Sequence, residues 1–76
     1  MGKPECISYP AKDVVTITGL EGDEIITLFD ISGRQLLYFR ASNFMEVINV
    51  SDLSKGTYLL KITKDKAEKI IKVVVD

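Results

Sequence analysis

Two alternating apolar and polar runs flank a short polar stretch between residues 48 and 62. The sequence there is Ile-Asn-Val-Ser-Asp-Leu-Ser-Lys-Gly-Thr-Tyr-Leu-Leu-Lys-Ile. Residues that alternate with a period of two lie on opposite faces of a β-strand, and Ser, Asp and Gly favour chain reversals. The segment is therefore predicted to form two strands joined by a turn, which restricts the chain to folds built from antiparallel strands.

Three residues are expected to fix the geometry of this turn. Leu53 supplies one apolar side chain within it, and Gly56 supplies the positive φ, or the absence of a Cβ, that the reversal needs. Tyr58 enters the next strand just after the glycine, as in the tyrosine corner of Greek-key sandwiches, so its ring should be buried and its hydroxyl bonded to upstream backbone. Asp30 and Gly33 mark a second, shorter turn.

Seven extended segments are separated by residues that form turns or carry charge. The segments are Glu5–Ser8, Asp13–Thr18, Glu24–Asp30, Arg34–Arg40, Phe44–Val50, Thr57–Thr63 and Ala67–Val75. No stretch shows sustained helical periodicity, and short strands with turns about every 8–12 residues are typical of a sandwich or barrel. We therefore predict an all-β fold, an immunoglobulin-like antiparallel β-sandwich of about seven strands. It is expected to be a single domain over residues 1–76, with linker residues at 1–3.

The phase of these segments predicts which side chains face the core. The inward set is Val15, Ile17, Ile26, Leu28, Leu36, Tyr38, Ile48, Val50, Tyr58, Leu60, Ile62, Ile71, Val73 and Val75. The same phase leaves nine apolar residues facing outward: Val14, Ile25, Phe29, Leu37, Phe39, Val47, Leu59, Ile70 and Val74. A free sandwich of this size should alternate more cleanly between core and water. Either the phase changes at β-bulges, or one outer face is an apolar docking surface.

Composition excludes several classes of functional site. The chain has no His and one Cys, so catalytic triads, zinc sites and an internal disulfide at Cys6 are excluded. Glu21, Asp23 and Glu24 cluster in one predicted loop, where solvation and turn chemistry are expected rather than calcium binding. We assign no catalytic, cofactor or metal site, and we do not expect an enzyme.

The net charge of −1 is unevenly distributed along the chain. Residues 54–76 carry six lysines against three acidic residues, whereas residues 1–53 carry four basic and eight acidic residues. The lysines alternate with apolar residues, which is typical of solvated strand faces, and no aromatic platform for stacking bases accompanies them. No apolar run approaches the ~18–20 residues of a membrane span. The chain is therefore predicted to bind no nucleic acid and to insert into no membrane.

Five motifs follow one another in register over nearly the whole chain. They are Tyr9-Pro10-Ala11-Lys12-Asp13, Val15-x-Ile17, Leu28 to Arg34, Leu53 to Tyr58, and Ile70 to Val75. Their order and spacing resemble the C-terminal sorting domain of the type IX (Por) secretion system of Bacteroidetes. The chain departs from the family pattern where Tyr9-Pro10 runs directly into Ala11, without the Asn-Pro that usually separates them.

The resemblance implies a secretion signal that directs an upstream cargo protein across the outer membrane. Its implied partners are the type IX translocon, a sortase that removes the tail, and the cargo, and pairing with a second copy stays open. The implied location is secreted or cell surface, reached through the periplasm of a Gram-negative bacterium. On this reading, Lys72, Val73, Val74 and Val75 form the terminal strand that the translocon recognises.

A different function is also compatible with the pattern. A structural or carbohydrate-binding β-sandwich could serve as an accessory module of a larger secreted protein. The position of the domain separates the two, because a sorting domain ends its reading frame and an accessory module occurs anywhere in it.

Overall fold

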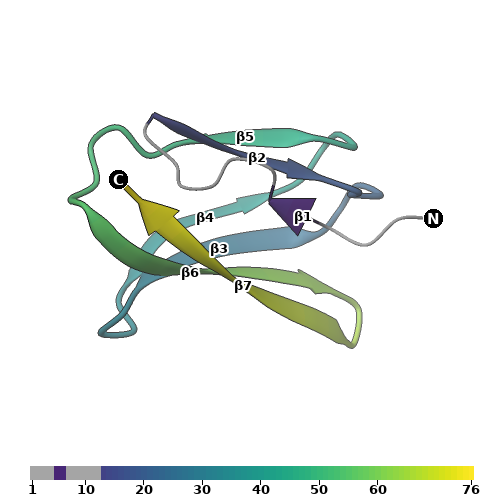
Figure 1. Ribbon diagram of the computed structural model, residues 1–76. Helices are drawn as coiled ribbons and strands as arrows, with labels where there is room; N and C mark the ends of the chain where they lie inside the picture. Colours follow the sequence, from purple (N-terminus) through teal and green to yellow (C-terminus); the bar gives the residue numbers. More distant parts are fainter. Residues whose placement is uncertain (1–4, 7–12) are drawn as a thin grey trace.

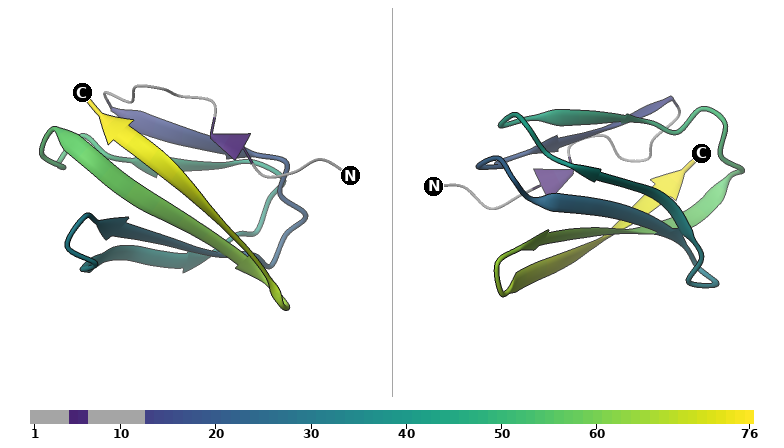
Figure 2. Two further views of the ribbon diagram at one scale, coloured as in Figure 1. Left: turned by 60° about the horizontal axis from the view of Figure 1, so that its bottom comes forward. Right: turned by 180° about the vertical axis from the view of Figure 1, so that it is seen from behind.

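The computed structural model describes residues 5–6 and 13–76, and this part of the chain folds as β-strands without a helix. The strands are β1 (Glu5–Cys6), β2 (Val14–Thr18), β3 (Ile25–Asp30), β4 (Gln35–Arg40), β5 (Glu46–Asn49), β6 (Gly56–Lys64) and β7 (Ala67–Val75). They form a three-stranded sheet in the order β1-β2-β5 and a four-stranded sheet in the order β4-β3-β6-β7. Every paired strand is antiparallel, and the two sheets lie as separate layers (Figures 1 and 2). The all-β prediction is confirmed.

The strands from β2 onward begin and end within two residues of the predicted segments, and β7 has the predicted bounds. Three sequence-based expectations concern residues outside the described part. These are the linker at residues 1–3, the end of the first segment at residues 7 and 8, and the departure from the family pattern at residues 9–11. Among the described residues, no helix is long and apolar enough to cross a membrane.

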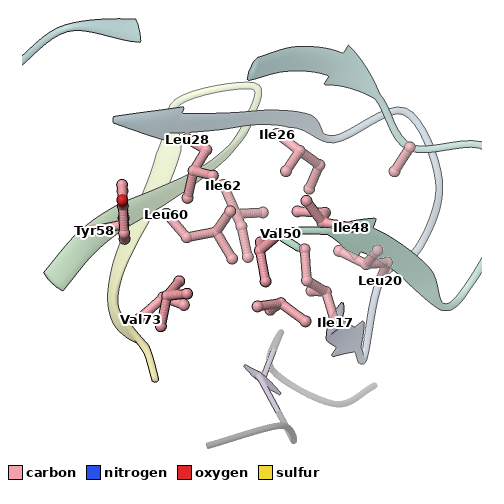
Figure 3. Packing of buried hydrophobic residues seen from close by; sticks show 13 residues of the cluster. Ile17, Leu20, Ile26, Leu28, Ile48, Val50, Tyr58, Leu60, Ile62 and Val73 are labelled. Carbon is pink, nitrogen blue, oxygen red and sulfur yellow. The ribbon is translucent and has the colours of Figure 1, made fainter. Parts of the chain in front are cut away.

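The hydrophobic core lies between the two sheets and receives side chains from both (Figure 3). Most of the predicted inward set is buried there: Val15, Ile17, Ile26, Leu28, Ile48, Val50, Tyr58, Leu60, Ile62, Val73 and Val75. Leu36 and Ile71 are partly buried against this cluster. Leu20 and Ala41 are also buried, although they lie in loops whose burial the strand phase does not predict. The core thus follows the period-two pattern and extends into two loops.

Strand β4 departs from the predicted phase. Tyr38 was expected in the core but is 61% exposed, whereas Leu37 and Phe39, expected outside, pack against the core. The cause is a β-bulge, because Leu28 pairs with Leu37 and the next residue of β3, Phe29, pairs with Gln35. Leu36 is the extra residue, and one extra residue exchanges the two faces of the strand that follows it. The inward assignment of Tyr38 is therefore wrong.

Candidate functional site

Strand β7 forms one edge of the four-stranded sheet and contains the residues expected to contact the translocon (Figure 1). It pairs with β6 without interruption, from Gly56 opposite Val75 to Lys64 opposite Ala67. Because its side chains alternate, Ile71, Val73 and Val75 face the core, and the residues between them face outward. This arrangement fixes β7 along its whole length while leaving one face accessible.

The alternation separates the four residues at the C-terminal end of β7. Val73 is 0% exposed and Val75 is 4% exposed, so both side chains belong to the core. Lys72 is exposed and Val74 is half-buried on the outer face. A partner that meets the folded domain can therefore contact the side chains of Lys72 and Val74, but not those of Val73 and Val75.

The outer face near β7 combines apolar side chains with lysines. Leu59 on β6 pairs with Lys72, and Lys61 pairs with Ile70. Ile70 is 58% exposed, and the Lys61 ammonium lies 3.5 Å from the Glu68 carboxylate. The face is therefore neither a continuous apolar patch nor an ordinary polar surface.

The turn before β6 fixes the start of β6, which is the strand that pairs with β7. Tyr58 is 8% exposed, and its hydroxyl donates a hydrogen bond of 2.6 Å to the backbone carbonyl of Ser54. Gly56 has a φ of 150°, and a Cβ built there would have no neighbouring atom within 4 Å. Leu53 packs against the core from within the turn, where its N–H donates to the Val50 carbonyl at 3.0 Å. The geometry is that of a turn held by one buried aromatic ring and its hydroxyl.

The turn between β3 and β4 is organised by one carboxylate. Oδ1 of Asp30 accepts hydrogen bonds from the Ser32 hydroxyl at 2.6 Å, the Ser32 N–H at 3.0 Å and the Arg34 N–H at 2.9 Å. The Ser32 hydroxyl and the Arg34 N–H favour the ionised form, so the pKa of Asp30 is lowered. Gly33 completes the turn with a φ of 91°, which is in the region that favours glycine. Asp30 therefore acts here as a structural acceptor.

The acidic loop between β2 and β3 is organised in a similar way around a buried residue. Glu24 is buried, and its two carboxylate oxygens accept the N–H of Glu21 at 2.7 Å and that of Gly22 at 2.8 Å. Burial alone raises the pKa of Glu24, but the backbone donors and nearby Lys64 together lower it. The Lys64 ammonium also binds the Glu21 carboxylate at 3.1 Å. Two of the three acidic side chains are thus engaged in structural contacts.

The burial of Glu24 could have been predicted from the alternation of residues in the following strand. Glu24 precedes Ile26 and Leu28 by two and four residues, so it lies on the inward face in the same phase. Sequence reasoning grouped it with the solvated loop instead. Among the described residues, no group of three or more His, Cys, Asp or Glu side chains could hold a metal ion.

Two open clefts lie away from β7. One, of about 560 Å³, is lined by Glu21, Ser42, Asn43, Phe44 and Met45. Phe44 is 78% exposed, and its carbonyl accepts the Leu20 N–H at 3.1 Å. The other, of about 410 Å³, is lined by Leu37, Phe39 and residues 46–49, between the edge strands β4 and β5. Sequence reasoning placed Phe44 at the start of a strand and did not identify it as an exposed aromatic residue.

The comparisons with known proteins agree with the order of motifs along the chain. The family model described as "Secretion system C-terminal sorting domain" matches residues 9–76, which include all strands from β2 to β7. A search of curated proteins found no match. Because the family match covers most of the sequence, the chain belongs to the family of secretion-system C-terminal sorting domains and is a C-terminal sorting signal for type IX secretion.

Proposed function

We propose that the type IX translocon recognises this domain through the outer face of β7. Lys72 and Val74 supply the accessible side chains, and Val73 and Val75 anchor the strand from its other face. The observation that carries the proposal is the uninterrupted pairing of β7 with β6, which holds the accessible face in one orientation. A rigid surface of this kind loses little conformational entropy on binding.

The same proposal includes the finer architecture of the domain. We infer an immunoglobulin-like sandwich of seven strands that forms one domain over residues 1–76, with residues 1–3 as a linker. Pairing between β2 and β5 and between β3 and β6, which are not consecutive in sequence, supports this topology. The buried Tyr58 and its hydrogen bond to Ser54 support it as well.

The proposed partners are the translocon, a sortase that removes the tail, an upstream cargo protein and a second copy of the domain. On this proposal the domain acts as a sorting signal and not as an enzyme. Its route is through the periplasm of a Gram-negative bacterium to the cell surface or the medium. The membership of the sorting-domain family supports this route.

The role of the β7 face is tested by a charged substitution that spares the core. An exported reporter carries the domain at its C-terminus, with Val74→Lys in β7 or with Val47→Lys in β5 as the matched control. Val47 is 54% exposed, so a lysine there remains in solvent. We expect Val74→Lys to keep the reporter in the periplasm and Val47→Lys to allow secretion, because burying an unpaired ammonium at a protein interface costs several kcal/mol.

Folding has to be separated from recognition in this experiment. Each purified variant is unfolded with urea, and only variants with the denaturation midpoint of the unchanged domain are interpreted. A folded Val74→Lys domain that is secreted as well as the control contradicts recognition through this face. Truncation of residues 72–76 is less informative, because it removes Val73 and Val75 from the core.

The alternative function, an accessory module that binds carbohydrate, has one feature in its favour. Phe44 lies exposed at a cleft that also contains the polar side chains of Glu21, Ser42 and Asn43. An aromatic face beside hydrogen-bonding groups is suited to a sugar ring. Glycan binding that is lost in Phe44→Ala, together with failure of the unchanged domain to export any reporter, would favour this alternative.

A further inference from the structure

The outer face of the four-stranded sheet extends well beyond β7. Strand register aligns its side chains in rows that run across the sheet from β4 through β3 and β6 to β7. The rows are Gln35, Phe29, Leu59 and Lys72; then Tyr38, Thr27, Lys61 and Ile70; and then Arg40, Ile25, Thr63 and Glu68. Together these residues form the outer-sheet face.

The middle of the outer-sheet face is more apolar than an ordinary solvated sheet. Its exposed or partly exposed apolar side chains are Ile25, Phe29, Tyr38, Leu59 and Ile70. Thr27 points outward at the centre and is only 6% exposed, so the side chains around it cover it. The solvated face of an antiparallel sheet is normally polar. Apolar and aromatic residues at the centre of a patch, with charged residues around them, are typical of a protein–protein interface.

The charged residues of this face are only partly compensated. Three cations and one carboxylate lie on it, and the Lys61 ammonium is paired with the Glu68 carboxylate at 3.5 Å. Arg40 on β4 and Lys72 on β7 are exposed, and neither forms an ion pair with another described residue. Two uncompensated positive charges therefore lie at opposite edges of the sheet, where carboxylates of a partner would complement them.

We propose that the translocon contacts the whole outer-sheet face, with Tyr38 and Arg40 as a second point of recognition and a translocon carboxylate opposite Arg40. This inference rests on the proposed recognition of β7 and extends it across the sheet. Tyr38 and Arg40 lie two residues apart on β4, so their side chains are neighbours on one face. Tyr and Arg are among the residue types that contribute most to binding energy at protein interfaces.

The size of the outer-sheet face favours a transient contact. β4 and β7 are three strand spacings apart, about 14 Å, and residues 68–74 extend for about 20 Å. The projected area of roughly 300 Å² is well below the roughly 800 Å² that each partner contributes to a stable interface. A contact confined to this face suits a sorting signal, which is bound only during export, better than it suits a permanent subunit.

Export of the reporter that carries the domain measures the contribution of β4. Tyr38→Ala is compared with Phe44→Ala, because both aromatic side chains are exposed and Phe44 lies outside the outer-sheet face. Arg40→Glu is compared with Lys66→Glu, which makes the same change of charge at an exposed position in the turn between β6 and β7. Variants are interpreted only if their urea denaturation midpoint is that of the unchanged domain.

We expect Tyr38→Ala and Arg40→Glu each to lower the initial rate of secretion about tenfold, the effect expected when one important interface residue is lost. The two control variants should be secreted at the rate of the unchanged domain. Secretion of folded Tyr38→Ala and Arg40→Glu at that same rate would overturn the inference. If Val74→Lys is retained in the same experiment, recognition at β7 stands and only its extension to β4 fails.

A series of substitutions at Arg40 tests the chemistry of the partner. Arg40→Lys keeps the positive charge, Arg40→Gln removes it and Arg40→Glu reverses it. With a carboxylate opposite Arg40, the rate of secretion should fall in that order. Equal rates for Arg40→Gln and Arg40→Glu would overturn the acidic partner, because Arg40 would then contribute only the packing of its apolar stem.

The purified domain separates two other occupants of the face. Vesicles of phosphatidylglycerol and phosphatidylethanolamine represent an anionic membrane, and sedimentation detects a second copy. We expect no binding to the vesicles, and no effect of Tyr38→Ala on the sedimentation profile. Vesicle binding that is lost in Arg40→Glu, or self-association that is lost in Tyr38→Ala, would overturn the assignment of this face to the translocon.

Discussion

The hydroxyl of Tyr58 provides the most direct test of how the turn before β6 is stabilised. Tyr58→Phe removes one hydrogen bond of 2.6 Å to the Ser54 carbonyl and keeps the buried ring. A neutral hydrogen bond contributes about 0.5–1.5 kcal/mol net to stability. Ser54 is exposed, so water can reach its carbonyl after the substitution, and the loss should be near 1 kcal/mol.

This loss is large enough to measure in a chain of 76 residues. The unfolding entropy expected for that length converts 1 kcal/mol into a fall of about 6 °C in melting temperature. Urea unfolding followed by far-UV circular dichroism should show a lower midpoint with an unchanged slope. Tyr38→Phe is the matched control, because Tyr38 is largely exposed on the outer face. An equal effect of the two substitutions, or no effect of Tyr58→Phe, would refute the proposed role of the hydroxyl.

Three further substitutions test other parts of the fold by the same unfolding measurement. Gly56→Val should destabilise by roughly 1–3 kcal/mol, because a β-branched residue is strained at a φ of 150° even though no atom obstructs its Cβ; a silent substitution would contradict this. Leu60→Ala should cost about 2–5 kcal/mol, since the side chain is fully buried, and a smaller loss would mean that the core collapses around the cavity. Glu24→Gln should cost about 2 kcal/mol at neutral pH through its bonds to backbone N–H groups. Because the folded pKa of Glu24 lies below its ordinary value of 4.5, its stabilisation is present above that value and is lost as the pH falls through the folded pKa. The Glu24→Gln chain should therefore lose less stability on acidification than the unchanged chain, and parallel pH profiles would contradict this.

The strands could be predicted because β-branched and aromatic residues alternate with a period of two on the inward face and because turn-forming residues separate the segments. A period of two locates β2, β3, β6 and β7 and nearly all of the core, because one face of each strand is mainly apolar. The bulge at Leu36 could not be read from the sequence, because Leu36, Leu37 and Phe39 are all apolar and fit either phase. The large number of apolar residues that were predicted to face outward therefore has two explanations. Leu37 and Phe39 reflect a change of phase, whereas Ile70 and Val47 are exposed.

The sequence predicted the candidate site in less detail than the fold. The terminal strand was identified as a unit, but the burial of Val73 and Val75 follows from the same alternation that defines the strand. Ion pairs such as Lys61 with Glu68 depend on the register between β6 and β7, which no local pattern specifies. The loop around Glu24 depends on backbone N–H groups that converge on its carboxylate, a feature of three-dimensional structure rather than of composition.

Export of a neutral reporter tests the central claim most directly. The reporter carries an ordinary signal for entry into the periplasm and the 76-residue chain at its C-terminus. It is expressed in a bacterium with an active type IX system and in an otherwise identical strain that lacks the translocon. We predict that the reporter appears in the medium or at the cell surface only when the translocon is present, and that the reporter without the chain stays in the periplasm. Retention of the intact, folded fusion in the periplasm of the active strain would contradict the account.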